Sequence, residues 1–448
     1  MTKRKETRTR KSRIWQGVRV GGVVLLVVYG VVWWHVLRIV EHDHWPPDSG
    51  AVTSAGALDL AEEFVLRDDV RRDDVAVEYA PSTASDVQLF LDGTQFYPDM
   101  VADISAAEHS VHLLMFGFTP GGWGDTFADL LIQRVADGIE VRLIVDGQGS
   151  KATGDNADFF LRLADAGVQI VVNDTLGIQA TGELPDRDRN LRVDEIGHAD
   201  HRKLMVIDGR IGWVGGAGLE DHFYDGGWID TYARVEGDIV LQLQAVFVTS
   251  FHAYSGSLPD NLEPYFPQPD EAGDIRMTVL QNVPGGFVPG TQASQQVIED
   301  AGERLDVMNA YFTDDGMISR IVDASERGVE VRILTSRDSN VYPAQYAFKS
   351  QYQRLMDAGV DIWEVPGVLH AKVTIADDSV VIGSINYDAW ALYRNLELSL
   401  LIEDAGVADV AREQLFEPTL ADGLTADAPN GVRETVPARI WWWLRYFL

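Results

Sequence analysis

Two short stretches of this chain repeat one arrangement of histidine, lysine and aspartate. In each stretch a lysine follows the histidine by two positions and an aspartate follows the lysine by five: His201, Lys203 and Asp208, then His370, Lys372 and Asp377. If folding brings the two stretches together, one imidazole can attack phosphorus while the other protonates the leaving oxygen. The two ammonium groups would hold the negative charge of the phosphate. The pattern therefore predicts a phosphodiester-cleaving site.

One copy of this pattern would more often be a strand end that carries surface charge. Two copies at the same spacing are hard to attribute to chance, and their surroundings repeat as well. A strand-like apolar run occupies 204–207 in the first copy and 373–376 in the second. A Gly-containing turn follows at 214–216 and at 382–384. We interpret the two stretches as equivalent halves of one site.

These residues resemble the paired motifs of the phospholipase D superfamily, and the chain is most similar to its bacterial cardiolipin synthases and related phosphatidyltransferases. The resemblance covers roughly residues 86–420. It implies an α/β protein with two tandem α/β/α sandwich domains packed with pseudo-twofold symmetry. It also implies a phosphohistidine intermediate, with His201 as the nucleophile and His370 as the acid, although the reversed roles stay open.

The resemblance assigns substrate-binding and orienting residues as well. Ser384 and Asn386 match the hydroxyl and amide that the family uses on the phosphate side, whereas Gly218 stands where many relatives carry Asn. Asp230 and Glu397 match the acids that orient the imidazoles, and Glu397 is expected to serve the opposite copy. A carboxylate on one imidazole nitrogen fixes the tautomer and leaves the other nitrogen free.

The aspartates of the two motifs have a different expected role. Asp208 and Asp377 are counted with the catalytic set because they belong to the repeated pattern. We expect them to brace loops near the lysines rather than to react.

The repeat extends over the elements that must position these groups. Residues 138–145 match 328–335, and 165–168 match 357–360, which indicates two copies of one fold unit. From Gly167 to His201 the first copy has 34 residues where the second has 11, so 23 extra polar residues within about 172–200 are expected to form a loop. Apolar runs and helical spacing predict strands buried on both faces and helices between them. In the first copy we expect strands over 111–118, 141–145 and 169–172, and helices over 126–136 and 159–166.

The amino-terminal segment has the pattern of a membrane anchor. Residues 1–19 contain eight basic residues and one acidic residue, and 20–37 form an uncharged run of 18 residues. As a helix this run would reach ~27 Å, close to the ~30 Å hydrocarbon core. A cleaved signal peptide would usually have a shorter apolar core and a small-x-small site. Basic flanks stay cytoplasmic, so we predict a single-pass cell-membrane protein whose catalytic domain is extracytoplasmic.

The carboxyl terminus combines aromatic and basic residues. Residues 439–448 hold three tryptophans and two arginines and are too short to span a bilayer. They either dock on the protein itself or lie at a lipid surface, which we favour. The expected organisation is a basic tail, a transmembrane helix, a linker, two catalytic domains and an interfacial tail: 1–19, 20–37, 38–85, 86–256, 257–425 and 426–448.

Composition narrows the ligand class. The chain has 448 residues, no cysteine and a net charge of −32. Such acidity argues against a nucleic-acid partner, because the grooves of proteins that bind nucleic acids are basic.

We expect no cofactor and no metal site, and a phospholipid substrate at a membrane bilayer. Phosphatidyl transfer is the leading function; phospholipase D hydrolysis, a nuclease-like phosphodiesterase and a non-catalytic tethered binding protein are the alternatives. The oligomeric state is not determined by the sequence.

Overall fold

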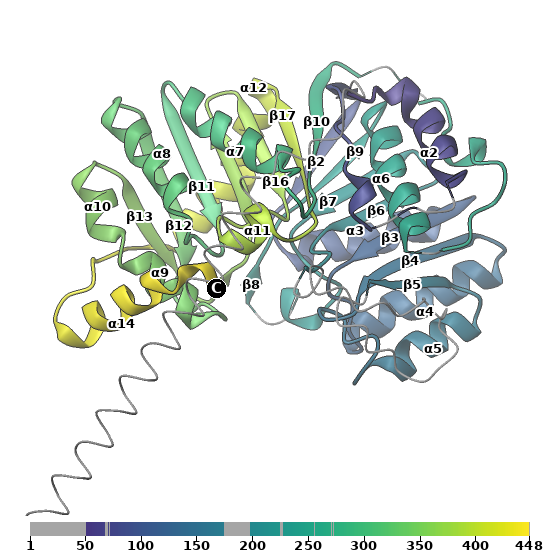
Figure 1. Cartoon of the computed structure of the whole chain (residues 1–448), viewed down its shortest axis with the longest axis horizontal. Helices are drawn as coiled ribbons and strands as arrows, with labels where there is room; N and C mark the ends of the chain where they lie inside the picture. The colour runs from purple at the N-terminus through teal and green to yellow at the C-terminus, as the bar shows by residue number, and fades with distance from the viewer. Residues whose placement is uncertain are drawn as a thin grey trace, which may run out of the picture.

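The computed structural model describes residues 51–447 except 68–69, 71, 174–197, 225–226, 255, 270 and 272. It contains two large mixed β-sheets, each with its own helices, which lie side by side in Figure 1. The prediction of an α/β protein with two tandem sheet domains is thereby confirmed. The expected membrane helix at 20–37 and most of the extra loop at 172–200 lie outside the described residues.

The first domain is built on a seven-stranded sheet. Its central strands β3, β4 and β6 are almost wholly buried and consist largely of apolar residues, as the sequence pattern predicts. β3, β4 and β5 run parallel, whereas β6, β7 and β9 pair antiparallel. The strand order is β2 (Asp86–Phe90), β9 (Tyr232–Glu236), β7 (Ile211–Gly215), β6 (Lys203–Ile207), β3 (Ser110–Met115), β4 (Glu140–Asp146) and β5 (Gln169–Asn173).

The second domain repeats this topology in a nine-stranded sheet. β1 comes from the segment expected to be a linker, so residues before the first domain complete the edge of the second sheet. The order is β1 (Ser82–Ala84), β10 (Ile275–Asn282), β17 (Glu397–Glu403), β16 (Ser379–Gly383), β15 (Lys372–Ala376), β11 (Arg304–Asn309), β12 (Glu330–Ser336), β13 (Asp361–Val365) and β18 (Leu424–Thr425). A two-stranded parallel pair, β8 (Trp228–Ile229) and β14 (Val368–Leu369), joins the domains.

Helices cover the outer face of each sheet. In the first domain they are α3 (Gly93–Ala106), α4 (Gly122–Ala136) and α5 (Ala157–Asp165), whose apolar sides form one core with the outward side chains of the sheet. The corresponding core of the second domain is lined by α7 (Pro289–Asp300), α8 (Asp315–Glu326), α9 (Tyr342–Lys349), α10 (Tyr352–Asp357) and α11 (Ala389–Tyr393). Burial of these apolar sides is the main term that holds each unit together.

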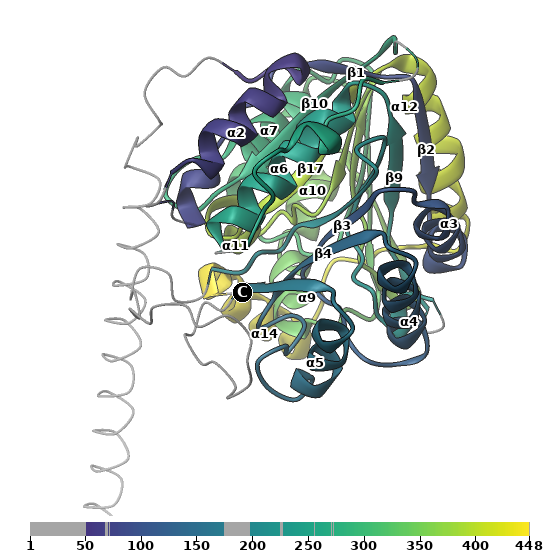
Figure 2. The same ribbon diagram turned by 90° about the vertical axis from the view of Figure 1, so that its right-hand side faces the viewer.

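The inner faces of the two sheets share a third core. Strands β16 and β17 pack against β7 and β9, and the long helix α6 (Ile239–Ala253) fills the remaining space with nearly every side chain buried. Helix α2 (Ala57–Val65) lies beside α6, as Figure 2 shows. The chain then continues through α12 (Ala405–Ala411), a π-helical turn at Arg412–Phe416, α13 (Glu417–Ala421) and α14 (Val432–Trp443). Because this core is common to both units, the domains are held in one fixed relation.

No helix in the described part of the chain has the length and apolar character needed to cross a bilayer. The sequence places the predicted span at 20–37, before the first described residue.

Candidate active site

The two repeated motifs lie at the starts of equivalent central strands. Lys203 is the first residue of β6, Lys372 is the first residue of β15, and each histidine precedes its lysine by two positions. Side chains two positions apart in an extended chain share a face, so each histidine and lysine point the same way. His201 and His370 are 9% and 8% exposed, and the lysines are almost fully buried.

Backbone hydrogen bonds bring each histidine against the other domain. The amide of His201 donates to the carbonyl of Leu396 at 2.9 Å, and the amide of His370 donates to the carbonyl of Ile229 at 2.7 Å. Leu396 immediately precedes β17, and Ile229 ends β8. The domain interface therefore passes directly between the two motifs.

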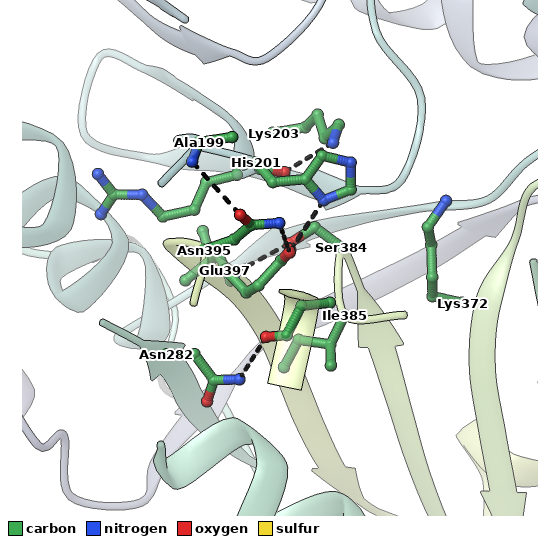
Figure 3. Close-up of polar contacts among 12 residues, drawn as sticks. Ala199, His201, Lys203, Asn282, Lys372, Ser384, Ile385, Asn395 and Glu397 are labelled. Atoms are coloured by element: carbon green, nitrogen blue, oxygen red, sulfur yellow. Dashed lines mark hydrogen bonds and ion pairs between the residues drawn. The ribbon is translucent and has the colours of Figure 1, made fainter. Parts of the chain in front are cut away.

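Each imidazole is oriented by an acid of the opposite domain. His201 Nδ1 lies 3.0 and 3.1 Å from the carboxylate oxygens of Glu397, and His370 Nδ1 lies 2.6 Å from Asp230 Oδ2. Figure 3 shows Glu397 pointing at His201, with Ser384 and Asn395 also bonded to its carboxylate. With Nδ1 bonded to an acid, Nε2 of His201 is the nitrogen left to react. Nε2 of His370 also lies within hydrogen-bond distance of Lys372 Nζ.

The lysines add positive charge beside both rings. Lys203 Nζ donates to the carbonyl oxygen of His201 at 2.6 Å and lies 4.8 Å from the centre of the Phe116 ring. Lys372 Nζ donates to the carbonyl of His370 and lies 2.7 Å from its Nδ1 and 3.2 Å from its Nε2. Each ammonium group lies close enough to act electrostatically on both imidazoles.

Burial dominates the protonation of this cluster. Burial, followed by the two lysine charges, lowers the pKa of both imidazoles well below the usual value. Burial also lowers the pKa of Lys203 to about 7 and that of Lys372 to about 8, and raises the pKa of Glu397 to about 8. His201 is therefore neutral at physiological pH, which is the state that a nucleophilic imidazole needs.

The motif aspartates brace turns, as expected, but they do so at the far ends of the strands rather than near the lysines. Asp208 accepts hydrogen bonds from the amides of residues 108–110 at 2.7–2.9 Å, and Asp377 does the same for residues 302–304 at 2.7–3.0 Å. Each follows the end of a five-residue strand that begins with the lysine. At ~3.3 Å per residue the strand separates the two groups by roughly 16 Å.

Of the two predicted binding residues, Ser384 contacts the orienting acid Glu397, and Asn386 follows Ser384 by two positions. Ser384 Oγ donates to Glu397 and accepts from the amide of Leu398 at 3.0 Å, so it secures the orienting acid. Asn386 is 5% exposed, and within the described structure its Oδ1 atom has no hydrogen-bond partner. A buried amide oxygen without a donor is costly unless a ligand completes it, which makes Asn386 a candidate ligand contact.

In the first half of the site, Gly218 occupies the position that corresponds to Asn386 in the repeat. A Cβ atom on Gly218 would lie 2.8 Å from Glu220 Oε2, and one on Gly117 would lie 2.4 Å from the same atom. The Glu220 carboxylate thus occupies the space that the two glycines leave open. Burial raises its pKa, and the nearby Lys203 opposes that change. Sequence reasoning missed Glu220, although the absent Asn was a signal that something else fills this position.

A buried ion pair between Arg202 and Asp200 supports the first motif on the side away from the active site. Arg202 alternates away from the site, is fully buried, and donates from Nε and Nη2 to Asp200 at 2.8 and 2.7 Å. Asp200 also accepts from Tyr254 at 2.8 Å, and Arg202 donates to Gln281 of the second sheet at 3.2 Å. This network was not predicted; an Arg directly before an apolar strand was its only sign in the sequence.

Among the described residues, no group of three His, Asp or Glu side chains is arranged to hold a metal ion.

The family profile and the sequence relatives indicate the same protein family. The profile of the family described as cardiolipin synthase, phospholipase D-like domain, matches residues 100–225 and 295–417. A probable cardiolipin synthase of Bacillus subtilis is 27% identical over 333 residues, which cover 72% of this chain and 64% of that protein. A cardiolipin synthase of Alkalihalophilus pseudofirmus is 28% identical over 348 residues, which cover 75% and 66%. The match thus spans about two thirds of the length of these relatives.

One solved structure shows the same fold over most of the chain. The crystal structure of a phosphatidylserine synthase of Haemophilus influenzae superposes with a TM-score of 0.61 and covers 82% of this chain and 97% of the other. The two sequences are 12% identical, so the likeness concerns the fold alone.

Proposed function

The chain belongs to the family of cardiolipin synthase phospholipase D-like domain proteins, and from this premise we propose that it is a phosphatidyltransferase. It acts on glycerophospholipids and transfers a phosphatidyl group to the alcohol of a second lipid, as the names of its relatives suggest. The observation that carries the proposal is the pair of buried imidazoles, each held at Nδ1 by an acid of the other domain.

The first step forms a covalent intermediate. Nε2 of His201 attacks the phosphorus of the donor lipid, a P–N bond forms, and the P–O bond to the departing alcohol breaks. His370 must carry a second proton for this step, and the negative charge of the bound phosphate favours that form by raising the pKa of its imidazole. The protonated ring gives its Nε2 proton to the departing oxygen, and Asp230 stabilises it at Nδ1. Lys203 and Lys372 hold the phosphate oxygens as charge develops on them.

The second step runs in the opposite sense. Nε2 of His370 removes the proton of the acceptor hydroxyl, whose oxygen attacks phosphorus while the P–N bond breaks and His201 is released. Water in place of the acceptor would give hydrolysis by the same residues. Burial of the site favours transfer, because a cleft filled by lipid has little free water.

The test uses the purified full chain with phosphatidylglycerol whose phosphate is labelled. We expect cardiolipin and free glycerol as products, and a labelled protein adduct that is stable to base and labile to acid. His201→Asn should abolish both product and adduct, whereas His370→Asn should slow the formation and turnover of the adduct. An adduct on the His201→Asn protein would reverse the two roles. Phosphatidic acid as the sole product would make the enzyme a phospholipase D.

The same assay tests the role of the lysines. Because Lys203 and Lys372 supply the positive charge, we expect turnover to be unchanged when EDTA is present. Loss of activity in EDTA that Mg²⁺ or Ca²⁺ restores would contradict this mechanism.

A further inference from the structure

Helix α14 has one face on the protein and one face away from it. Ala438 is buried, and Trp442 packs against the core of the second domain. The helix lies along α9, as Figure 1 shows near the carboxyl terminus. Arg445 then stacks over the rings of Trp442 and Tyr446, at 4.4 Å from each centre. The tail is therefore fixed in place by its inner face.

The outer face of α14 is an apolar stripe. Val432, Val436, Ile440 and Trp443 follow each other at intervals of four, four and three residues, so they share one side of the helix. They are 79%, 48%, 51% and 41% exposed. They make up four of the seven large apolar side chains that are exposed in the part of the chain the structure describes. Such a concentration marks an interaction surface rather than ordinary scatter.

Basic side chains border this stripe. Arg439 lies three positions after Val436 and four before Trp443, and Arg433 lies three before Val436. Residues 432–447 carry three arginines and one glutamate, although the whole chain has a net charge of −32. Exposed apolar side chains with a tryptophan suit the boundary between lipid and water, and the neighbouring arginines would attract anionic headgroups.

Helix α14 is linked to the active site through α9. The ring of Tyr311 is 6.0 Å from that of His370, and its hydroxyl donates to Asn340 at 2.8 Å. Asn340 lies two residues before α9, the helix on which α14 packs. The helix that carries the stripe therefore packs on an element whose amino-terminal end reaches the His370 half of the site.

We propose that the outer face of α14 docks on an anionic phospholipid bilayer and holds the active site at the headgroups. This proposal rests on the proposed function, since it explains how a lipid substrate reaches a buried site. A second copy of the chain is a poorer occupant, because a stable protein interface buries about 800 Å² per partner and this stripe is one helix face wide.

The first experiment measures contact with lipid and needs no enzymatic activity. The chain has no cysteine, so a single one at position 440 can carry an environment-sensitive fluorophore. The full chain with Ile440→Cys is reconstituted in phosphatidylcholine vesicles with or without phosphatidylglycerol, some of it brominated. Matched controls carry Leu66→Cys or Leu424→Cys, which are 83% and 51% exposed elsewhere. We expect a blue shift and quenching at 440 alone, strongest with phosphatidylglycerol. Quenching at 440 no greater than in the controls would overturn the proposal, as would burial of the label by a dimer without lipid.

The second experiment links docking to turnover. Ile440→Glu together with Trp443→Glu should lower activity on vesicles about tenfold, which corresponds to ~1.4 kcal/mol of lost docking energy. Activity on a short-chain phosphatidylglycerol that stays monomeric should not change, and Leu424→Glu should affect neither assay. Equal losses on both substrates would mean that the tail supports the fold, contrary to the proposal. Lipid quenching without activity on any lipid would leave docking intact and refute the proposed function instead.

Discussion

At the scale of single residues, Glu397 and Asp230 decide which nitrogen of each imidazole can react. A carboxylate at Nδ1 holds the ring orientation and stabilises the positive charge that appears on the imidazole during proton transfer. Glu397 has no exposed surface, so water cannot replace it in this role.

We therefore expect Glu397→Gln to lower kcat by up to about 10⁴-fold, because the amide no longer selects the correct tautomer. The matched control is Glu403→Gln, at the other end of the same strand, where the carboxylate is 39% exposed and pairs with Arg276. Steady-state rates and thermal unfolding should be measured for both. A Glu397→Gln enzyme with the kcat of the control would contradict an orienting role.

The pKa values of the two lysines predict how kcat/KM of the free enzyme depends on pH. As pH rises through about 7, Lys203 loses its proton, and Lys372 follows at about 8. Loss of each charge removes stabilisation of the phosphate, so kcat/KM should fall as pH increases over this range. The negative charge of bound phosphate favours the protonated lysines. The decline of kcat at alkaline pH should therefore begin at a higher pH than the decline of kcat/KM. A kcat/KM that increases from pH 7 to pH 9 would exclude this assignment.

At the scale of elements, the segment that leads into strand β6 presents chemistry on one side and structural support on the other. Lys203 faces the site, whereas Arg202 points into the core shared by the domains and pairs with Asp200. Removing one partner of a buried pair leaves an uncompensated charge.

Arg202→Ala should therefore lower the free energy of unfolding by about 3–5 kcal/mol, measured by urea denaturation. Arg276→Ala removes a pair whose arginine is 57% exposed and should cost no more than about 1 kcal/mol. The double change Asp200→Asn with Arg202→Met should cost less than Arg202→Ala alone, because neither charge remains. A single Arg202→Ala variant as stable as the Arg276→Ala control would contradict the role of this pair.

At the scale of the whole molecule, the apolar stripe of α14 and the predicted span at 20–37 would tie the protein to a membrane at two points. Eight basic residues precede the span, which predicts that residues 40–448 lie outside the cytoplasm. Ser257 is exposed and can be replaced by the only cysteine of the chain.

An impermeant thiol reagent should label this cysteine in intact cells, and external protease should digest the domains while it spares a tag at residue 1. Labelling that occurs only after lysis would place the domains in the cytoplasm and contradict the predicted orientation.

The amino-acid sequence was sufficient to predict the repeat, the family and most of the local elements. The strand expected over 111–118 is β3, and the helix expected over 126–136 is α4, begun four residues earlier. These predictions succeed because side-chain periodicity and the spacing of His and Lys are local properties of the chain.

Only the tertiary structure decided which groups meet. His201 and Glu397 are separated by 196 residues, and His370 and Asp230 by 140, so their contacts depend on how two sheets pack. The same packing sends Arg202 into the shared core and moves Glu220 into the space beside Gly218. It also turns one side of α14 outward. The sequence alone could not decide whether the carboxyl-terminal segment docks on the protein or on lipid. Which face of a helix stays exposed depends on which face packs against the rest of the protein.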